Sequence, residues 1–179
     1  MSRLIPINSP SDIPAKYTGT PVEKLIRYQN FGEPFEEYKD AQILVGMCMD
    51  NRKVLKVPEN FAYVLRTGGG NLRQNEFKVS FAIAVGGVTA IALVGHTNCG
   101  MVHVYSKRDQ FINGMVERAG WTEEQAKEHF MTLAPLFEID NEQEFVMSEA
   151  HRLQRKYPKI LVAPFIYKLE DNKLYMVED

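Results

Sequence analysis

Three short apolar runs constrain the fold most strongly, because they alternate with segments of helical length. The runs cover residues 43–47, 62–66 and 90–95. Between the second and third, residues 75–85 have the length and apolar content of a crossover helix that ends at a Gly-Gly pair. This alternation is typical of a parallel, doubly wound sheet. We therefore predict an α/β fold with a mostly parallel β-sheet flanked by helices.

The flanking sequence predicts the remaining elements. Residues 1–20 are rich in proline and read as an irregular arm. Helical signals, namely caps, apolar periodicity and glycine or proline stops, occur at 22–28, more weakly at 31–38, and at 102–119, 122–133 and 141–157. A strand at 160–168 and a C-terminal edge strand at 174–177 follow across a polar turn. With 179 residues, we expect a single α/β domain over 1–179, with an arm and helices at 1–39 and a core at 40–179.

Composition excludes several classes of protein. The net charge of −2 gives no reason to expect binding to nucleic acid or to an anionic membrane. The longest apolar stretch, 81–95, is interrupted by two glycines and is too short to span a bilayer. No secretory signal is visible at the start. We expect a soluble, cytoplasmic protein whose two cysteines, Cys48 and Cys99, bind metal or do chemistry rather than form a disulfide.

A cluster of chemically active residues follows directly on the first apolar run. It reads Cys48-Met49-Asp50-Asn51-Arg52. Cysteine supplies a thiolate for zinc, an ionised aspartate accepts hydrogen bonds, and arginine holds a carboxylate through two parallel bonds. If the chain stays extended here, the side chains at alternate positions 48, 50 and 52 point to one side.

A second cluster, His96-Thr97-Asn98-Cys99, follows the third apolar run. In a parallel sheet both clusters emerge at the carboxyl edge, where such folds bind ligands. Cys48, His96 and Cys99 then give a zinc ion three protein ligands and one open position for water, which is the catalytic arrangement.

Two states of this zinc site stay open at the level of sequence. In one, Asp50 accepts a hydrogen bond from zinc-bound hydroxide while Arg52 fixes the carboxylate. In the other, Asp50 becomes the fourth ligand and closes the site.

Two further features near the clusters have modest interpretations. The glycine run after Arg66 lacks the lysine of a phosphate-binding loop and the third small residue of a dinucleotide turn, so we expect a tight turn or a close approach of backbone to the metal site. His103 lies four residues after Cys99 and would share a face with it on a helix, which would suit proton transfer. A packed or solvent-facing histidine is the commoner case. His129 and His151 lie on later helices with no reason to approach the site.

Together these motifs resemble the β-class carbonic anhydrases, especially their small prokaryotic members, over residues 40–179. The motifs are Cys48-x-Asp50-x-Arg52, Arg66-Thr-Gly-Gly-Gly and Gly95-His-Thr-Asn-Cys-Gly-Met101. The resemblance implies Zn²⁺ held by Cys48, His96 and Cys99, with Asp50 and Arg52 as the catalytic dyad. It also implies reversible hydration of carbon dioxide to bicarbonate, a mostly parallel sheet flanked by helices, and a homodimer or higher homo-oligomer that completes the substrate pocket across its interface.

One departure and two alternatives accompany this resemblance. The family usually has Arg-Asn-Ala-Gly where this chain has Arg66-Thr67-Gly68-Gly69, which bears on the pocket wall. Hydrolases of carbonyl sulfide or carbon disulfide share the scaffold, although Gly95 before His96 fits the anhydrases better. A non-catalytic zinc or thiol sensor is the other alternative, and the Asp50–Arg52 pair argues against it.

Overall fold

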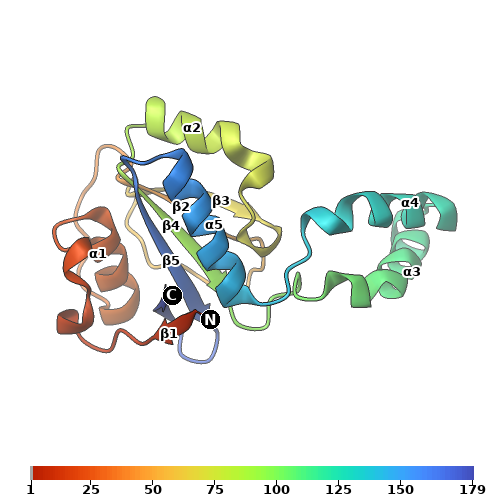
Figure 1. Cartoon of the computed structure of the whole chain (residues 1–179), viewed down its shortest axis with the longest axis horizontal. Coiled ribbons are helices and arrows are strands. Elements are labelled where there is room, and N and C mark those ends of the chain that lie inside the picture. Colours follow the sequence, from red (N-terminus) through yellow and green to blue (C-terminus); the bar gives the residue numbers. More distant parts are fainter. Residues whose placement is uncertain (1) are drawn as a thin grey trace.

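A six-stranded sheet forms the centre of the molecule (Figure 1). The computed structural model describes residues 2–179. Across the sheet the strand order is β1-β6-β5-β4-β2-β3. In chain order the strands are β1 (Arg3–Ile5), β2 (Ile43–Cys48), β3 (Ala62–Thr67), β4 (Ala90–His96), β5 (Leu161–Lys168) and β6 (Lys173–Glu178).

The inner strands run parallel, which confirms the predicted sheet. β2 pairs in parallel with β3 and β4, and β4 pairs in parallel with β5. β6 adds to β5 antiparallel, as the polar turn before it predicts. The prediction that this C-terminal strand is the edge of the sheet is wrong, because β1 from the N-terminal arm pairs with its outer side.

Helices cover both faces of the sheet, and two more project from it (Figure 1). They are α1 (Pro21–Ile26), α2 (Glu76–Ala84), α3 (Arg108–Ala119), α4 (Glu123–Leu133) and α5 (Glu142–Lys156). α1 packs on one face, α2 and α5 pack on the other, and α3 and α4 form a hairpin that extends away from the body.

The alternating pattern of β2 decides which side chains enter which core layer. Ile43, Val45 and Met47 join the cluster beneath α1. Leu44 points the other way and joins the cluster beneath α2 and α5. Because both faces of β2 are buried, the strand is apolar throughout, as is usual in parallel sheets.

Most helix boundaries agree with the caps in the sequence. Thr122 accepts a hydrogen bond from the Gln125 amide at 3.2 Å and completes a capping box for α4. The Asn141 side chain caps α5. Gly120 ends α3 with φ 72°.

Two predicted helical segments are wrong. No helix covers 32–38, because Gly32, at φ 63°, ends the π-helical turn Arg27–Phe31 that follows α1. The helix expected from residue 102 begins only at Arg108. His103 adopts φ 50° and is followed by a short 3₁₀ helix, Val104–Lys107, so the chain between Cys99 and His103 is not helical.

Within residues 2–179, none of the helices combines the length and apolar character needed to cross a lipid bilayer. That residues 1–179 form a single domain stays a prediction, and its first residue, Met1, lies outside the described residues.

Candidate metal centre

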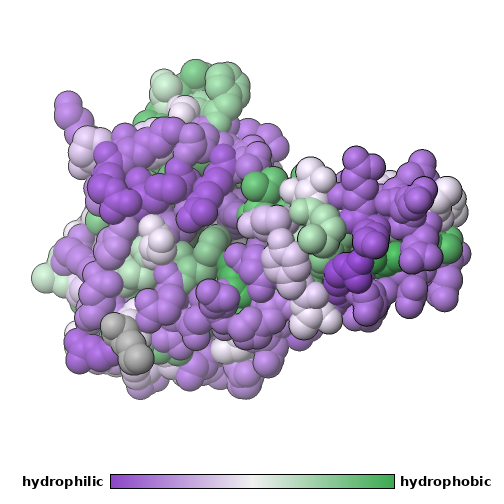
Figure 2. Space-filling model, turned by 45° about the vertical axis from the view of Figure 1, so that its right-hand side comes forward, coloured by the Kyte–Doolittle hydropathy of each residue, from purple (hydrophilic) through white to green (hydrophobic). Residues whose placement is uncertain are grey.

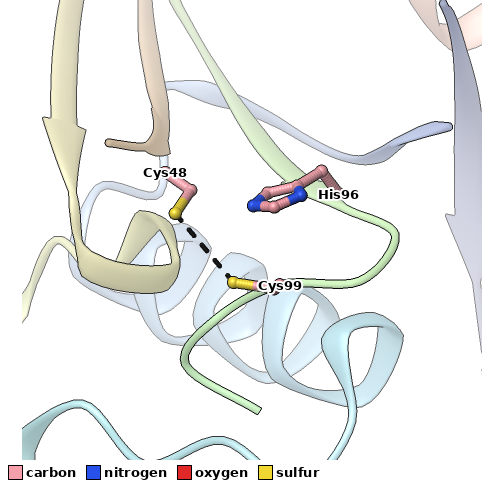
Figure 3. Close-up of side chains that lie close together, drawn as sticks. All are labelled: Cys48, His96 and Cys99. Carbon is pink, nitrogen blue, oxygen red and sulfur yellow. Dashed lines mark hydrogen bonds between the residues drawn. The ribbon is translucent and has the colours of Figure 1, made fainter. Parts of the chain in front are cut away.

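Three metal-binding side chains meet at the carboxyl ends of β2 and β4 (Figure 3). Cys48 is the last residue of β2, His96 is the last residue of β4, and Cys99 lies in the turn that follows. All three are buried, and His96 has no exposed surface. The parallel pairing of β2 with β4 therefore brings together two clusters that lie far apart in the sequence.

The spacing of the donor atoms suits a metal ion. The two sulfur atoms are 3.9 Å apart, far more than the ~2.05 Å of a disulfide. Two thiolates on a tetrahedral zinc, each with a bond of about 2.3 Å, stand about 3.8 Å from one another. The ligand atoms of Cys48, His96 and Cys99 all lie within 4.8 Å of one another.

The imidazole of His96 is oriented as a metal ligand. Its Nδ1 lies 2.9 Å from the Thr97 carbonyl oxygen. Because a carbonyl only accepts, Nδ1 carries the hydrogen, and Nε2 keeps a free lone pair. Nε2 is buried and has no hydrogen-bond partner within residues 2–179. A buried acceptor without a partner is costly, and a metal ion bound between this nitrogen and the two sulfurs would remove that cost.

The two thiols interact directly when no ion lies between them. The hydrogen bond that the Cys99 thiol donates lowers the pKa of Cys48 well below its ordinary value of 9.0. Backbone N–H groups of Asp50 and Gly69 also favour the Cys48 thiolate. The same hydrogen bond between the two cysteines, together with burial, raises the pKa of Cys99. A metal that binds both sulfurs as thiolates must displace the proton that they share.

Asp50 and Arg52 form a close pair beside this cluster. Arg52 Nε lies 3.1 Å from Asp50 Oδ1 and 3.0 Å from Oδ2, and Nη2 lies 2.6 Å from Oδ2. The hydrogen bonds from the Arg52 guanidinium hold the pKa of the Asp50 carboxyl well below its ordinary value of 3.8. Asp50 is therefore an ionised group that only accepts hydrogen bonds.

A turn, not an extended chain, brings these groups together. β2 ends at Cys48, and the following residues bend so that Asp50 Oδ1 accepts the Arg52 amide at 2.9 Å. The expectation of an extended chain over 48–52 is therefore wrong. Arg52 also donates to the Asn98 carbonyl at 2.9 Å, which ties the pair to the second cluster. Asp50 Oδ2 then lies 3.9 Å from His96 Nε2.

The glycine run forms a tight turn against the metal cluster, as predicted. Gly69 and Gly70 have φ values of 65° and 77°, which favour glycine. A Cβ on Gly68 would lie 3.1 Å from the Phe137 ring and 3.3 Å from Met101 Sδ. The glycine that stands in place of the family's alanine therefore makes room for two bulky side chains at this wall.

The other histidines lie outside this cluster. His103 is exposed and faces Glu138 and Asp140 across the root of the α3–α4 hairpin. Because the chain between Cys99 and His103 is not helical, the two side chains do not share a helix face, and the reason for expecting His103 near the metal no longer applies. His129 packs between the rings of Phe111 and Trp121. His151 lies 3.1 Å from the Asp179 carboxylate.

Sequence reasoning missed two residues that support the site. Lys53 is buried beneath the turn, and its Nζ donates to the carbonyl oxygens of Cys48 and Asp50. Glu142, at the start of the helix predicted over 141–157, accepts the Cys99 amide at 3.2 Å. A lysine directly after Arg52 gives no sequence signal of burial, because lysine is usually exposed.

Comparison with known proteins identifies the family to which the sequence is similar. The sequence matches the family described as "Carbonic anhydrase" over residues 45–177, which is most of the chain. No curated protein sequence is similar enough to count as a match.

Several solved structures share the fold. A β-carbonic anhydrase, isoform I, from the protozoan Trichomonas vaginalis aligns with a TM-score of 0.65 and 19% identity, covering 82% of this chain and 88% of that one. A carbonic anhydrase from Glaciozyma antarctica gives 0.60 and 18%, covering 90% and 98%. The apo form of a carbon disulfide hydrolase gives 0.55 and 19%, covering 86% and 84%. At these identities the likeness establishes the fold alone.

Proposed function

Because this chain belongs to the β-class carbonic anhydrase family, we propose that it is a zinc enzyme that reversibly hydrates carbon dioxide to bicarbonate and a proton. In this proposal Cys48, His96 and Cys99 hold Zn²⁺, and Asp50 and Arg52 are the catalytic dyad. The observation that carries the proposal is the buried, unpartnered Nε2 of His96, which lies within 4.8 Å of two cysteine sulfurs. Beside it lies a carboxylate that an arginine keeps ionised.

A zinc ion in this site would act as a Lewis acid and make a coordinated water more acidic. The protein itself supplies a hydrogen-bond acceptor close to the position that this water would occupy. Asp50 does this as an ionised carboxylate whose Oδ2 is 3.9 Å from the ligand nitrogen of His96. It accepts a hydrogen bond and thereby orients the attacking oxygen toward carbon dioxide.

Arg52 keeps Asp50 in the role of acceptor. Its guanidinium contacts both carboxylate oxygens and is itself anchored to the Asn98 carbonyl. To become a fourth metal ligand, Asp50 would have to break some of its hydrogen bonds with Arg52. We therefore favour the open state, in which three protein ligands leave one position for water and substrate.

A homodimer or larger homo-oligomer is part of the proposal. Apolar side chains gather over α2, which Figure 2 shows at the top of the molecule, and on the neighbouring edge strand β3. Phe77 is 81% exposed, and the patch also includes Tyr63, Phe81 and Val85. Such a patch is typical of an interaction surface. Sedimentation velocity of the parent and of Phe77→Glu tests it, because a charge in the interface should shift the population toward monomers.

A cytoplasmic location completes the proposal. Both cysteines are free and buried, which is consistent with a reducing compartment.

Stopped-flow measurement of carbon dioxide hydration by the zinc-loaded protein tests the function. We expect a rate that depends on zinc and falls to background after chelation. Release of hydrogen sulfide from carbonyl sulfide or carbon disulfide, without hydration of carbon dioxide, would replace the proposal with the sulfur-hydrolase alternative. Zinc binding without either activity would indicate a sensor.

A further inference from the structure

Lys53 is a buried charged side chain that the proposed mechanism does not use. It is 1% exposed. Within residues 2–179 no carboxylate forms a salt bridge with it. Lysine is rarely buried without an acidic partner, since an apolar side chain of similar volume fills such a space at lower cost. A specific task for its amine group is therefore the better explanation.

The amine holds the two ends of the turn that carries the site. Lys53 Nζ lies 3.0 Å from the Cys48 carbonyl oxygen and 2.9 Å from the Asp50 carbonyl oxygen. These carbonyls flank Met49, whose side chain points outward and is 65% exposed. One buried group thus joins the backbone of a metal-binding cysteine to the backbone of the dyad carboxylate.

A second side chain approaches the same two carbonyls from the surface. Arg66 Nη1 lies 3.3 Å from each of them, which is longer than either bond from Lys53. Arg66 is exposed, whereas Lys53 is not. The shorter, water-excluded bonds of Lys53 therefore fix the turn more firmly. Two N–H groups suffice for them, and the amine has at least two in either protonation state.

We propose that Lys53 is a positioning residue for the metal centre, which sets the distance between the Cys48 sulfur and the Asp50 carboxylate by clamping the backbone between them. The proposal rests on the function proposed above for Cys48 and Asp50. Groups that orient metal ligands typically change metal affinity by about 10- to 100-fold when removed.

The test compares Lys53→Met with Lys56→Met in the full-length protein. Methionine keeps much of the apolar stem and removes the donors. Lys56 is exposed three residues further along the same loop, and its side chain makes no hydrogen bond with residues 2–179, so it is the matched control. Zinc affinity is measured by competition with a chelator, and the absorption spectrum of the cobalt-substituted protein reports the geometry of the thiolate ligands.

For Lys53→Met we expect zinc affinity about 10- to 100-fold weaker and a shifted cobalt spectrum, with Lys56→Met indistinguishable from the parent. In an active enzyme kcat should fall more than KM rises, because Asp50 is displaced rather than removed. Lys53→Arg keeps donors and should recover part of the affinity. Unchanged zinc affinity and an unchanged cobalt spectrum in Lys53→Met would overturn the proposal. Both readouts are independent of carbon dioxide hydration, so a failure of the proposed function is seen separately.

A second measurement applies if Lys53→Met does not fold. In the parent, NMR of ¹³C-labelled lysine side chains should show the Lys53 signal shifting when zinc is removed, while the Lys56 signal stays in place. A Lys53 signal that is insensitive to zinc would contradict the clamp.

Discussion

The candidate metal centre and the ion cluster between α2 and α5 are both buried polar regions. They differ in whether their buried polar atoms have hydrogen-bond partners. In the ion cluster, the carboxylate of Glu149 is 1% exposed. Its Oε1 accepts from Arg152 at 2.6 Å, and its Oε2 accepts from Arg152 at 2.9 Å and Arg73 at 3.3 Å. In the candidate metal centre, His96 Nε2 is also buried and accepts no hydrogen bond from any of residues 2–179.

The ion cluster continues outward to solvent in the same paired manner. Glu76 at the start of α2 pairs with both Arg152 and Lys156 of α5. Each acidic group there faces a basic one, so the cluster joins the two helices. The comparison teaches that paired buried charges stabilise the fold, whereas the His96 nitrogen beside two cysteine sulfurs has the arrangement of a group that could bind a metal.

Replacing the unsatisfied group should have the largest effect. We expect His96→Ala to reduce bound zinc from about one per chain to nearly none and to abolish hydration, because two thiolates alone hold zinc poorly. Metal analysis of the purified protein measures this, with His151→Ala as the exposed control. Full zinc content in His96→Ala would show that His96 is not a ligand.

Asp50→Asn should separate chemistry from metal binding. The amide can donate as well as accept, so it no longer orients the reacting oxygen, and we expect a loss of about 100- to 10,000-fold in hydration rate with zinc retained. Asp40→Asn, on an exposed loop, should behave as the parent in the same stopped-flow assay. A rate within about twofold of the parent would remove Asp50 from the dyad.

In the ion cluster, Glu149→Gln should lower the free energy of unfolding and leave the zinc content of the protein unchanged. The change removes the buried negative charge that Arg73 and Arg152 share and leaves Arg152 with Glu76 as its acidic partner, so we expect a cost of about 1–3 kcal/mol. Urea unfolding measures the free energy, and exposed Glu128→Gln on α4 is the control. Loss of zinc without loss of stability would reverse the roles assigned to the two regions.

The outer part of the ion cluster predicts a smaller, pH-dependent effect. Lys156, followed by Arg152, lowers the pKa of Glu76 below its ordinary value of 4.5. A depressed pKa in the folded state stabilises the protein above pH ~4.5, and this contribution is lost as the pH falls toward the folded value. Glu76→Gln should cost less than about 1 kcal/mol at pH 7, because the pair is partly exposed. The difference in the free energy of unfolding between the parent and Glu76→Gln should be smaller below pH ~4.5 than at pH 7. A difference that does not change with pH would argue against the ion pair.

His103→Ala should have the smallest effect. Since His103 lies on an exposed turn beside Glu138 and Asp140, we expect the maximal rate at low buffer concentration to stay within about twofold of the parent. A lower rate that recovers as imidazole is added would instead identify His103 as the proton shuttle.

The sequence predicts the sheet, and the clustering of Cys48, His96 and Cys99 at its edge, where local pattern and strand geometry agree. The apolar runs predict β2, β3 and β4 to within a residue at each end. β2 and β4 are buried along their whole length, whereas β3 lies at the edge of the sheet with partly exposed side chains. The convergence of Cys48 with His96 and Cys99 follows from parallel pairing, which places successive strand ends at one edge.

What the sequence does not predict depends on contacts made by distant parts of the chain. The strand β1 owes its pairing to β6 at the opposite terminus, and three residues in a proline-rich arm give no strand signal. The left-handed backbone of His103 breaks a helical pattern that composition alone supports. Lys53 is buried because its own turn folds so that the amine reaches two carbonyl oxygens. No periodic pattern in the sequence indicates this burial.

Zinc K-edge X-ray absorption of the purified protein tests the central claim most directly. If the unpaired His96 nitrogen and the two cysteine sulfurs bind the ion, the spectrum should fit two sulfur atoms at about 2.3 Å and two lighter atoms at about 2.0–2.1 Å. A first shell made only of nitrogen and oxygen, or one of four sulfur atoms, would contradict it.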